Sequence, residues 1–286
     1  MRNPSKAERV KGMKVVEKIA MLTAYDYSMA ALESANKVDM ILVGDSANFI
    51  LNGRDTTRGI SMDQMVEMAE RVANGVTKEG NDYALVVGDL PAGSYDTIEN
   101  AVTNAKKLWT AGVDAVKLEG GTEKPYLANT IKAIIAQGIP VQGHIGYTPQ
   151  SETLADKGVV QGKTEKSIEK LFADYHLLEK AGVFSVVLEC IPWQVAQLIT
   201  ERARVPTIGI GAGSYCDGQV LVSYDLLGLS TGLPSKPGTF PKFVWQYDLK
   251  AAKAIRQYVA DVKAGKMPGL KESYSLADVG VLEKYR

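Results

Sequence analysis

Three acidic residues stand directly after short apolar runs of this chain, at Asp45, Asp89 and Glu119. A carboxylate is costly to bury unless it is paired or bound to a cation. Carboxylate oxygens are the ligands that hard ions such as Mg²⁺ prefer. If the three runs are neighbouring strands, these carboxylates could share one divalent cation. The alternative is that Asp45 and Asp89 accept hydrogen bonds from loop backbone amides.

Further titratable residues lie at the ends of similar runs. Lys117 stands two residues before Glu119, so both side chains would leave a strand on the same face. Lys117 could bind a substrate carboxylate or steady an enolate oxygen, or it could simply form a salt bridge with Glu119. Glu189 ends an apolar run and suits a general base, the alternative being a glutamate that caps the following helix. His144 ends another run, and site and structural roles are both open for it.

The composition excludes several classes of protein and site. His144 and His176 are the two histidines, and Cys190 and Cys216 are the two cysteines. A three-histidine metal site is therefore impossible, and neither a thiolate zinc site nor a disulfide framework is expected. Lys plus Arg and Asp plus Glu each total 33, which argues against nucleic-acid binding through a global basic field.

The distribution of apolar residues along the chain bears on where in the cell the protein is located. No apolar run approaches the roughly 20 residues that span a bilayer. The first ten residues are polar and lack the apolar core of a signal peptide. We therefore expect a cytoplasmic protein with small-molecule partners and with neither nucleic-acid nor membrane partners.

Short β-rich runs alternate with longer stretches of helical periodicity. The predicted strands are 19–23, 40–44, 84–88, 115–118, 141–144, 185–188, 207–210 and 219–222. The predicted helices are 26–37, 62–78, 97–111, 125–137, 165–181, 193–203 and 248–264. Near-continuous apolar strands are typical of a parallel sheet buried on both faces.

This alternation predicts an α/β fold, a single (β/α)8 TIM barrel domain over 1–286. Its core would span about 12–262, with an N-terminal lead-in and a C-terminal helical extension. We expect 263–286 to form a loose tail, because glycines and a proline interrupt it. The alternative is an open doubly wound sheet, which would usually show a glycine-rich loop after its first strand. This chain has no glycine at 24–27.

Barrel enzymes place their catalytic groups at the carboxyl ends of the strands. The second to sixth strands would therefore bring their titratable residues to one rim. The glycine-rich run at 208–213 follows the seventh strand, where it could bind a phosphate or simply allow close packing. Helix-end signals support the element boundaries, with Ser61 and Thr164 at N-termini and Gly112 and Gly182 at C-termini.

The same residues carry a family likeness. The stretches concerned are Met21–Tyr27, Val43–Ser46, Asp89–Pro91, Gly93–Tyr95, Val116–Gly121, Gly143–His144, Thr148–Ser151, Val160–Gly162, Leu188–Cys190 with Pro192, Ile208–Gly213, Asp217–Gln219 and Pro241–Phe243. In their order and spacing the chain resembles the ketopantoate hydroxymethyltransferase family over about residues 12–262. The resemblance implies a (β/α)8 barrel that assembles into a homo-oligomer, commonly a decamer.

The resemblance also implies a reaction. A keto acid, 3-methyl-2-oxobutanoate, would be chelated to Mg²⁺ and would accept a one-carbon unit from 5,10-methylenetetrahydrofolate. Carried over by position, Asp45 and Asp89 would ligate the metal and contact the keto acid, with Glu119 close to the metal.

The remaining positions follow from the same resemblance. Ser46 and Lys117 would contact the keto acid, and His144 would line the same site. Glu189 would be the catalytic base that removes the proton next to the ketone. The product would be 2-dehydropantoate, a precursor in pantothenate biosynthesis.

The chain departs from the family pattern at a few places, notably Arg58-Gly59, Glu67-Met68 and the stretch 152–158. One alternative is therefore a paralogous metal-dependent barrel that forms the enolate of another α-keto acid, for aldol-type or lyase chemistry. A second alternative is a barrel that binds but does not catalyse. Such proteins usually lose the base or a metal ligand first, whereas every candidate is present here.

Overall fold

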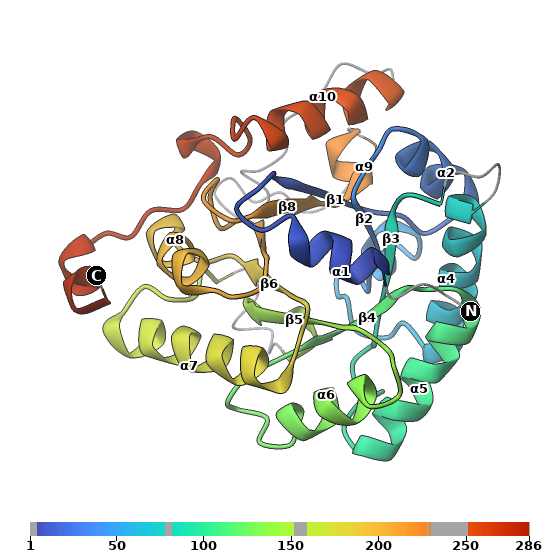
Figure 1. Ribbon diagram of the computed structural model, residues 1–286, viewed down its shortest axis with the longest axis horizontal. Coiled ribbons are helices and arrows are strands. Elements are labelled where there is room, and N and C mark those ends of the chain that lie inside the picture. Colours follow the sequence, from blue (N-terminus) through green and yellow to red (C-terminus); the bar gives the residue numbers. More distant parts are fainter. Residues whose placement is uncertain (1–4, 78–81, 152–158, 228, 230–250, 286) are drawn as a thin grey trace.

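Eight parallel strands close into a barrel in chain order, and β8 pairs back to β1 (Figure 1). The computed structural model describes residues 5–77, 82–151, 159–227, 229 and 251–285. The strands are β1 (Ile19–Thr23), β2 (Met40–Val43), β3 (Leu85–Asp89), β4 (Ala115–Glu119), β5 (Val141–Gly146), β6 (Ser185–Glu189), β7 (Thr207–Ile210) and β8 (Gly218–Leu221). The predicted barrel is confirmed, and the ends of its strands differ from the prediction by no more than two residues.

Helices surround the barrel. They are α1 (Ser5–Gly12), α2 (Tyr27–Ala35), α3 (Ala47–Ile50), α4 (Met62–Thr77), α5 (Ile98–Ala111), α6 (Leu127–Ile135), α7 (Glu165–Ala181), α8 (Trp193–Arg202), α9 (Ser223–Leu226) and α10 (Ala251–Lys263). The described residues also include the 3₁₀ segments η2 (Pro149–Ser151), η3 (Leu270–Glu272) and η4 (Val279–Tyr285). No helix separates β7 from β8, and α10 packs against β1 and α2. The start of the predicted last helix and the motif Pro241–Phe243 lie outside the described residues.

The predicted helix ends are confirmed in detail. Ser61 and Gln64 exchange hydrogen bonds at the start of α4, at 2.9 and 3.2 Å. Thr164 forms a capping box at the start of α7. Gly112 and Gly182 end α5 and α7 with positive φ angles, which glycine adopts at little cost. These signals stop each helix where the next strand must begin.

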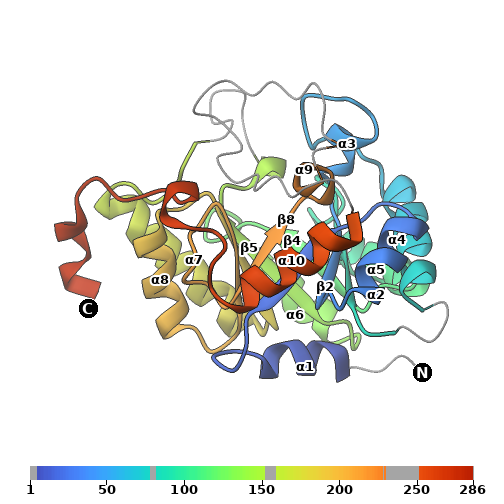
Figure 2. The ribbon, with the colours of Figure 1, turned by 90° about the horizontal axis from the view of Figure 1, so that it is seen from above.

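Apolar side chains fill two layers. One layer lies between the strands and the surrounding helices, and the other fills the inside of the barrel. Ala7, Val10 and Met13 of the N-terminal lead-in belong to the inner layer. Figure 2 shows α1 lying across one end of the barrel, away from α3 and α9. The lead-in therefore closes the end opposite the carboxyl ends of the strands.

Charged pairs fix this closure. Asp39, Asp114 and Asp217 each stand just before a strand and accept a backbone hydrogen bond from the adjacent strand, each at 2.9 Å. Each also meets a cation of the lead-in: Arg9 reaches Asp39 (3.7 Å), Lys6 reaches Asp114 (3.2 Å) and Lys14 reaches Asp217 (2.8 Å). The lead-in is thus attached to strands from both halves of the chain. The sequence analysis did not foresee this role.

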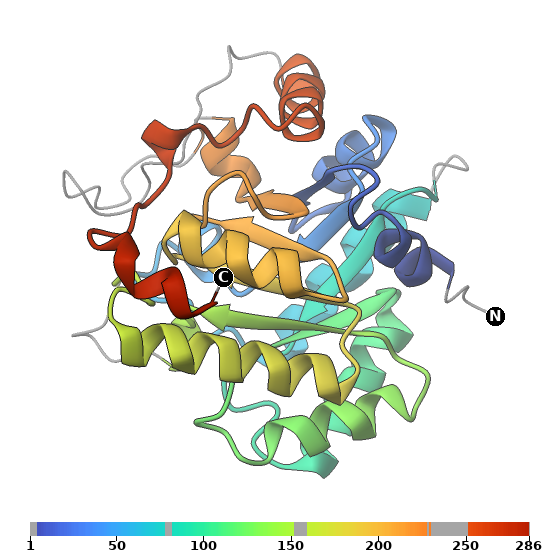
Figure 3. The ribbon, with the colours of Figure 1, turned by 60° about the vertical axis from the view of Figure 1, so that its left-hand side comes forward.

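The C-terminal tail is not the loose extension that its glycines and proline led us to expect. Figure 3 shows this segment crossing the helices α7 and α8. The ring of Tyr285 stacks on Phe172 of α7, with 4.8 Å between centroids. The backbone amide of Trp193 donates to the carbonyl of Tyr274 at 2.9 Å. Contacts spaced along the tail hold it, although it has little regular structure of its own.

Candidate active site

The three predicted carboxylates converge at the carboxyl ends of β2, β3 and β4. Asp45 follows β2, while Asp89 and Glu119 are the last residues of β3 and β4. One oxygen atom from each lies within 4.8 Å of the others, and all three side chains are buried. The closed barrel brings these strand ends together because β2, β3 and β4 are adjacent in the sheet.

The electrostatics of this cluster favour a cation. Burial raises the pKa of Asp45 well above its usual range, and repulsion from Asp89 and Glu119 raises it further. Burial also raises the pKa of Asp89. Among the described residues, Asp45 Oδ2 and Asp89 Oδ1 are buried without a hydrogen-bond partner. Two orphaned carboxylate oxygens in an all-oxygen cluster fit a hard divalent cation.

Lys117 lies beside the cluster and pairs mainly across the sheet. Its Nζ is 2.7 Å from Asp89 Oδ2 and 3.6 Å from Glu119 Oε1. Burial alone would lower the pKa of Lys117, but the Asp89 and Glu119 carboxylates outweigh it and raise the pKa. A lysine held in its charged form is a poor Schiff-base nucleophile and a good partner for an anion.

Asp89 also shows part of the loop-backbone alternative. Its Oδ2 accepts the amide of Asp45 at 3.5 Å as well as the ammonium of Lys117. Its other oxygen remains without a partner in the described structure. The backbone amide of Asp45, in the loop after β2, and Lys117 therefore account for one oxygen of Asp89 and leave the other for a ligand.

His144 bridges the acidic cluster and the candidate base. Its Nδ1 lies 3.2 Å from Glu119 Oε1, and its Nε2 lies 3.1 Å from Glu189 Oε2. Both contacts are ion-pair approaches rather than well-aligned hydrogen bonds. Burial lowers the pKa of His144, but the Glu119 carboxylate prevails and raises it to about 9. Burial alone would raise the pKa of Glu119. The positive charges of His144 and, to a lesser extent, Lys117 outweigh burial and lower this pKa to about 2.

Glu189 ends β6 and keeps limited contact with solvent, since its side chain is 12% exposed. The backbone carbonyl of Glu189 accepts the amide of Tyr147 at 2.9 Å. Cys190 then turns the chain with a φ of +48°, a conformation uncommon for a residue other than glycine. The carboxylate is thus held at the rim, where a substrate in the barrel mouth could reach it.

The other predicted residues fall into two groups. Ser46 lies at the rim next to Asp45, and its Oγ is 2.8 Å from the hydroxyl of Tyr25. His176 lies on α7, edge-on to Tyr175, away from the cluster. Cys190 and Cys216 are buried and are not joined in a disulfide bond.

The glycine-rich run at 208–213 shows the close-packing alternative. Gly213 has a φ of +81°, and an added Cβ there would approach Trp193 Cβ to 2.3 Å. The carbonyl of Gly213 accepts a hydrogen bond from the side chain of Gln219 at 2.8 Å. The positive φ and the close approach of Trp193 explain why position 213 is a glycine. A bound phosphate is not needed to account for it.

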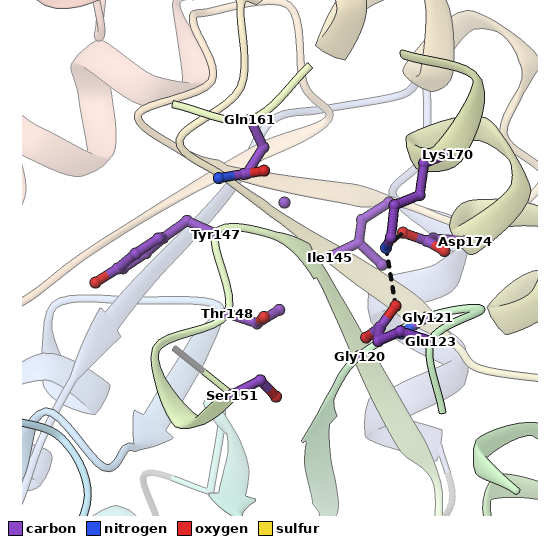
Figure 4. A pocket seen from close by; sticks show the side chains of 11 residues that line it. Gly120, Gly121, Glu123, Ile145, Tyr147, Thr148, Ser151, Gln161, Lys170 and Asp174 are labelled. Carbon is purple, nitrogen blue, oxygen red and sulfur yellow. Dashed lines mark hydrogen bonds and ion pairs between the residues drawn. The ribbon is translucent and has the colours of Figure 1, made fainter. Parts of the chain in front are cut away.

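A polar cavity of about 230 Å³ opens beside the site, between the loops after β4 and β5 and the helix α7 (Figure 4). Its lining includes Gly120, Gly121, Glu123, Ile145, Gly146, Tyr147, Thr148, Ser151, Gln161, Lys170 and Asp174. Lys170 extends to Glu123, with 2.8 Å between Nζ and Oε2. Gly146 pairs with Glu189 in the sheet. The cavity therefore borders the strand position that pairs with Glu189, and it was not predicted from the sequence.

Two buried polar residues of the site also went unassigned. Tyr95 and Gln150 belong to the stretches that carry the family likeness, but their residue types alone suggest no chemistry. Both contact Glu119: the amide of Gln150 donates to Glu119 Oε2 at 3.0 Å, and Tyr95 lies 3.3 Å from the carbonyl of Glu119. Their place in those stretches was the available signal.

Comparison with known proteins identifies close relatives. The family model described as ketopantoate hydroxymethyltransferase matches residues 5–270. A 3-methyl-2-oxobutanoate hydroxymethyltransferase of Clostridium botulinum (strain 657) is 44% identical over 264 residues, covering 92% of each chain. A protein of the same name from Phocaeicola vulgatus is 45% identical over 263 residues, covering 90% of this chain and 91% of the relative.

Solved structures share the fold at lower identity. A putative phosphonomutase from Burkholderia cenocepacia J2315 superposes with a TM-score of 0.62 at 14% identity, covering 79% of this chain and 95% of the other. A 2,3-dimethylmalate lyase, described as a member of the PEP mutase/isocitrate lyase superfamily, gives a TM-score of 0.55 at 15% identity, covering 80% and 83%. These likenesses show the barrel architecture alone. In the described part of the chain, no helix combines the length and the apolar character that a bilayer crossing needs.

Proposed function

The chain belongs to the ketopantoate hydroxymethyltransferase family and is a transferase, and we propose that it converts 3-methyl-2-oxobutanoate to 2-dehydropantoate in pantothenate biosynthesis. The one-carbon donor is 5,10-methylenetetrahydrofolate. The keto acid loses the hydrogen on C3 and gains a hydroxymethyl group there, while water supplies the hydroxyl oxygen and tetrahydrofolate leaves. The observation that carries this proposal is the convergence of the Asp45–Asp89–Glu119 cluster with Glu189 through His144.

Mg²⁺ is the proposed cofactor, held by Asp45 and Asp89 with Glu119 close to it. The orphaned oxygens of Asp45 and Asp89 support this assignment. When bound, the ion would supply the positive charge that stabilises an oxyanion of the keto acid. Lys117 and Ser46 contribute a buried positive charge and a rim hydroxyl for the same substrate.

Glu189 is the proposed base that takes the proton from C3 and leaves the enolate to attack the one-carbon unit. Its partly exposed position at the end of β6 supports this role, because a base must come within hydrogen-bond reach of the proton it removes. His144 lies within 3.1 Å of Glu189, so its charge orients the carboxylate. The cavity next to Gly146 adds room beside the base for part of the second substrate.

The alternative substrate is another α-keto acid handled by the same enolate chemistry. Arg58, where the chain departs from the family pattern, is exposed on the loop between α3 and α4. Its Nε donates to the carbonyl of Gln150 at 2.9 Å, which places it over the rim of the site. Glu67 and Met68 lie on α4, where Glu67 pairs with Arg71 and Met68 packs in the outer core. Among the departures within the described residues, Arg58 therefore bears on substrate choice, while the stretch 152–158 lies outside the described residues.

Proton exchange in heavy water tests the proposed chemistry. The protein is incubated with Mg²⁺ and 3-methyl-2-oxobutanoate, without folate, and the C3 hydrogen is followed by NMR. We expect exchange that EDTA abolishes and that Glu189→Gln lowers by at least about 100-fold. A folded, metal-bound protein without exchange would refute the proposed substrate, and a panel of other keto acids would then test the alternative.

We also propose a homo-oligomer in the cytoplasm, and the family resemblance implies a decamer as the assembly. Light scattering after size-exclusion chromatography would give its mass. A monomer at micromolar concentration would contradict this proposal without affecting the proposed chemistry.

A further inference from the structure

The buried residue Gln150 contacts Glu119, Tyr95 and the backbone of Leu90. Gln150 lies in η2, after β5, and is 5% exposed. Its backbone amide donates to Glu119 Oε2 at 3.0 Å. The other carboxylate oxygen of Glu119, its Oε1, faces His144 and Lys117. One oxygen of Glu119 is therefore occupied by the turn, and the other is presented to the cluster.

The carboxamide of Gln150 keeps this amide in place. Its Nε2 donates to the carbonyl of Leu90 at 3.1 Å, and its Oε1 accepts the hydroxyl of Tyr95 at 2.9 Å. Leu90 directly follows Asp89. The same residue thus connects the backbone next to Asp89 with the side chain of Glu119, which belong to adjacent strands.

Lys124 completes the support from the loop after β4. Its Nζ donates to the carbonyl of Glu119 at 2.9 Å and to the hydroxyl of Tyr95 at 3.2 Å. The hydroxyl of Tyr95 accepts from Lys124 and has acceptors in Gln150 Oε1 at 2.9 Å and in the carbonyl of Glu119 at 3.3 Å. Its single proton has the shorter contact with Gln150. Lys124, Tyr95 and Gln150 thus form one connected set of hydrogen bonds around Glu119.

We propose that Gln150 and Tyr95 are positioning residues, which hold the carboxylate of Glu119 at the distance from Asp45 and Asp89 that a divalent cation requires. This inference rests on the proposed metal site. Residues that orient metal ligands typically change metal affinity by 10- to 100-fold when they are replaced. A contact that merely stabilises the loop would instead change the unfolding temperature and leave metal affinity unaltered.

Binding of Mn²⁺, followed by electron paramagnetic resonance without substrate, separates these cases. Tyr95→Phe removes one hydroxyl and preserves the ring. Gln150→Met preserves the chain length and the backbone amide but removes both carboxamide hydrogen bonds. We expect each variant to bind Mn²⁺ about 10-fold more weakly, and the Mg²⁺ concentration for half-maximal proton exchange to rise in parallel.

Tyr175→Phe is the matched control. Tyr175 is also buried, and its hydroxyl donates to Glu179 on α7, away from the acidic cluster. This variant should lose thermal stability and keep the Mn²⁺ affinity of the unmodified protein. Unchanged affinity in folded Tyr95→Phe and Gln150→Met would overturn the positioning role alone. Failure of the unmodified protein to bind Mn²⁺ would overturn the proposed metal site and this inference together.

Discussion

Replacement of Lys117 by Met would expose the electrostatic cost of the acidic cluster. Lys117 is buried 2.7 Å from Asp89 and 3.6 Å from Glu119, so its loss leaves two buried carboxylates without their shared cation. Removing one partner of a buried ion pair typically costs about 3–5 kcal/mol of folding free energy. We expect a loss of this size for metal-free Lys117→Met at neutral pH, measured by urea unfolding in EDTA.

Added Mg²⁺ should restore a large part of this loss. A ligand at 100 times its dissociation constant stabilises the native state by about 2.7 kcal/mol. The variant should gain more from Mg²⁺ than the unmodified protein does, because Asp89 has lost the ammonium group that balances it at 2.7 Å. The unfolding midpoint should shift while the slope of the transition stays the same, since the buried surface hardly changes.

The pH dependence of the variant gives an independent check. The folded-state pKa of Asp89 is already raised by burial, and removal of Lys117 raises it further. A carboxyl group with a raised folded-state pKa contributes stability that is lost as the pH rises through that value. The deficit of Lys117→Met should therefore grow as the pH rises above the ordinary Asp pKa of 3.8.

A second lysine serves as the control. Lys170 also faces two carboxylates, those of Glu123 and Asp174, but its side chain is 51% exposed. Lys170→Met should cost about 1 kcal/mol or less and respond to neither Mg²⁺ nor EDTA. Equal losses for the two variants, or a Lys117→Met loss that Mg²⁺ leaves untouched, would refute the reasoning about the cluster.

Three further predictions concern other parts of the molecule. Ser46→Ala should weaken binding of the keto acid about 5- to 10-fold through loss of one hydrogen bond and leave Mn²⁺ affinity intact. An unchanged KM for the keto acid would contradict a contact between Ser46 and the substrate. Met13→Ala should lower the unfolding free energy by about 2–5 kcal/mol, because it opens a cavity at the amino end of the barrel. The rate of C3 proton exchange per folded molecule should stay the same. A loss of exchange in folded protein would show that Met13 also affects the active site. Burial raises the pKa of Glu33, so the unmodified protein should lose stability relative to Glu33→Gln as the pH rises above about 4.5; parallel stability curves from pH 4 to pH 8 would show that Glu33 does not titrate in this way.

The sequence predicted which residues reach the rim but did not predict which of them meet. Lys117 was compared with Glu119, two positions along the same strand. In the structure Lys117 is directly opposite Asp89 on β3, and this cross-strand contact is the shorter one. Adjacent strands lie about 4.8 Å apart, whereas residues two apart on one strand are separated by about 6.6 Å. The pairing register decides such contacts, and the sequence of a single strand does not encode it.

His144 illustrates the same limit. The sequence left its role open, because a lone histidine carries no information about its neighbours. The register places Glu119 opposite His144 and Glu189 opposite Gly146, so the imidazole comes to lie between the two carboxylates. The sequence analysis also missed the supporting role of Gln150, since its backbone amide, which any residue but proline could supply, makes the contact with Glu119.

The attachment of the lead-in has a consequence for synthesis of the chain on the ribosome. Lys14 and Asp217 are separated by 203 positions, which take about 10–40 s to translate at 5–20 residues per second. An eight-residue helix such as α1 is too short to be stable alone in water. During that interval the apolar residues of the lead-in lack part of the inner layer in which they pack, because that layer includes residues as late as Ile208 and Val220. The lead-in is thus made long before the last of its partners exists.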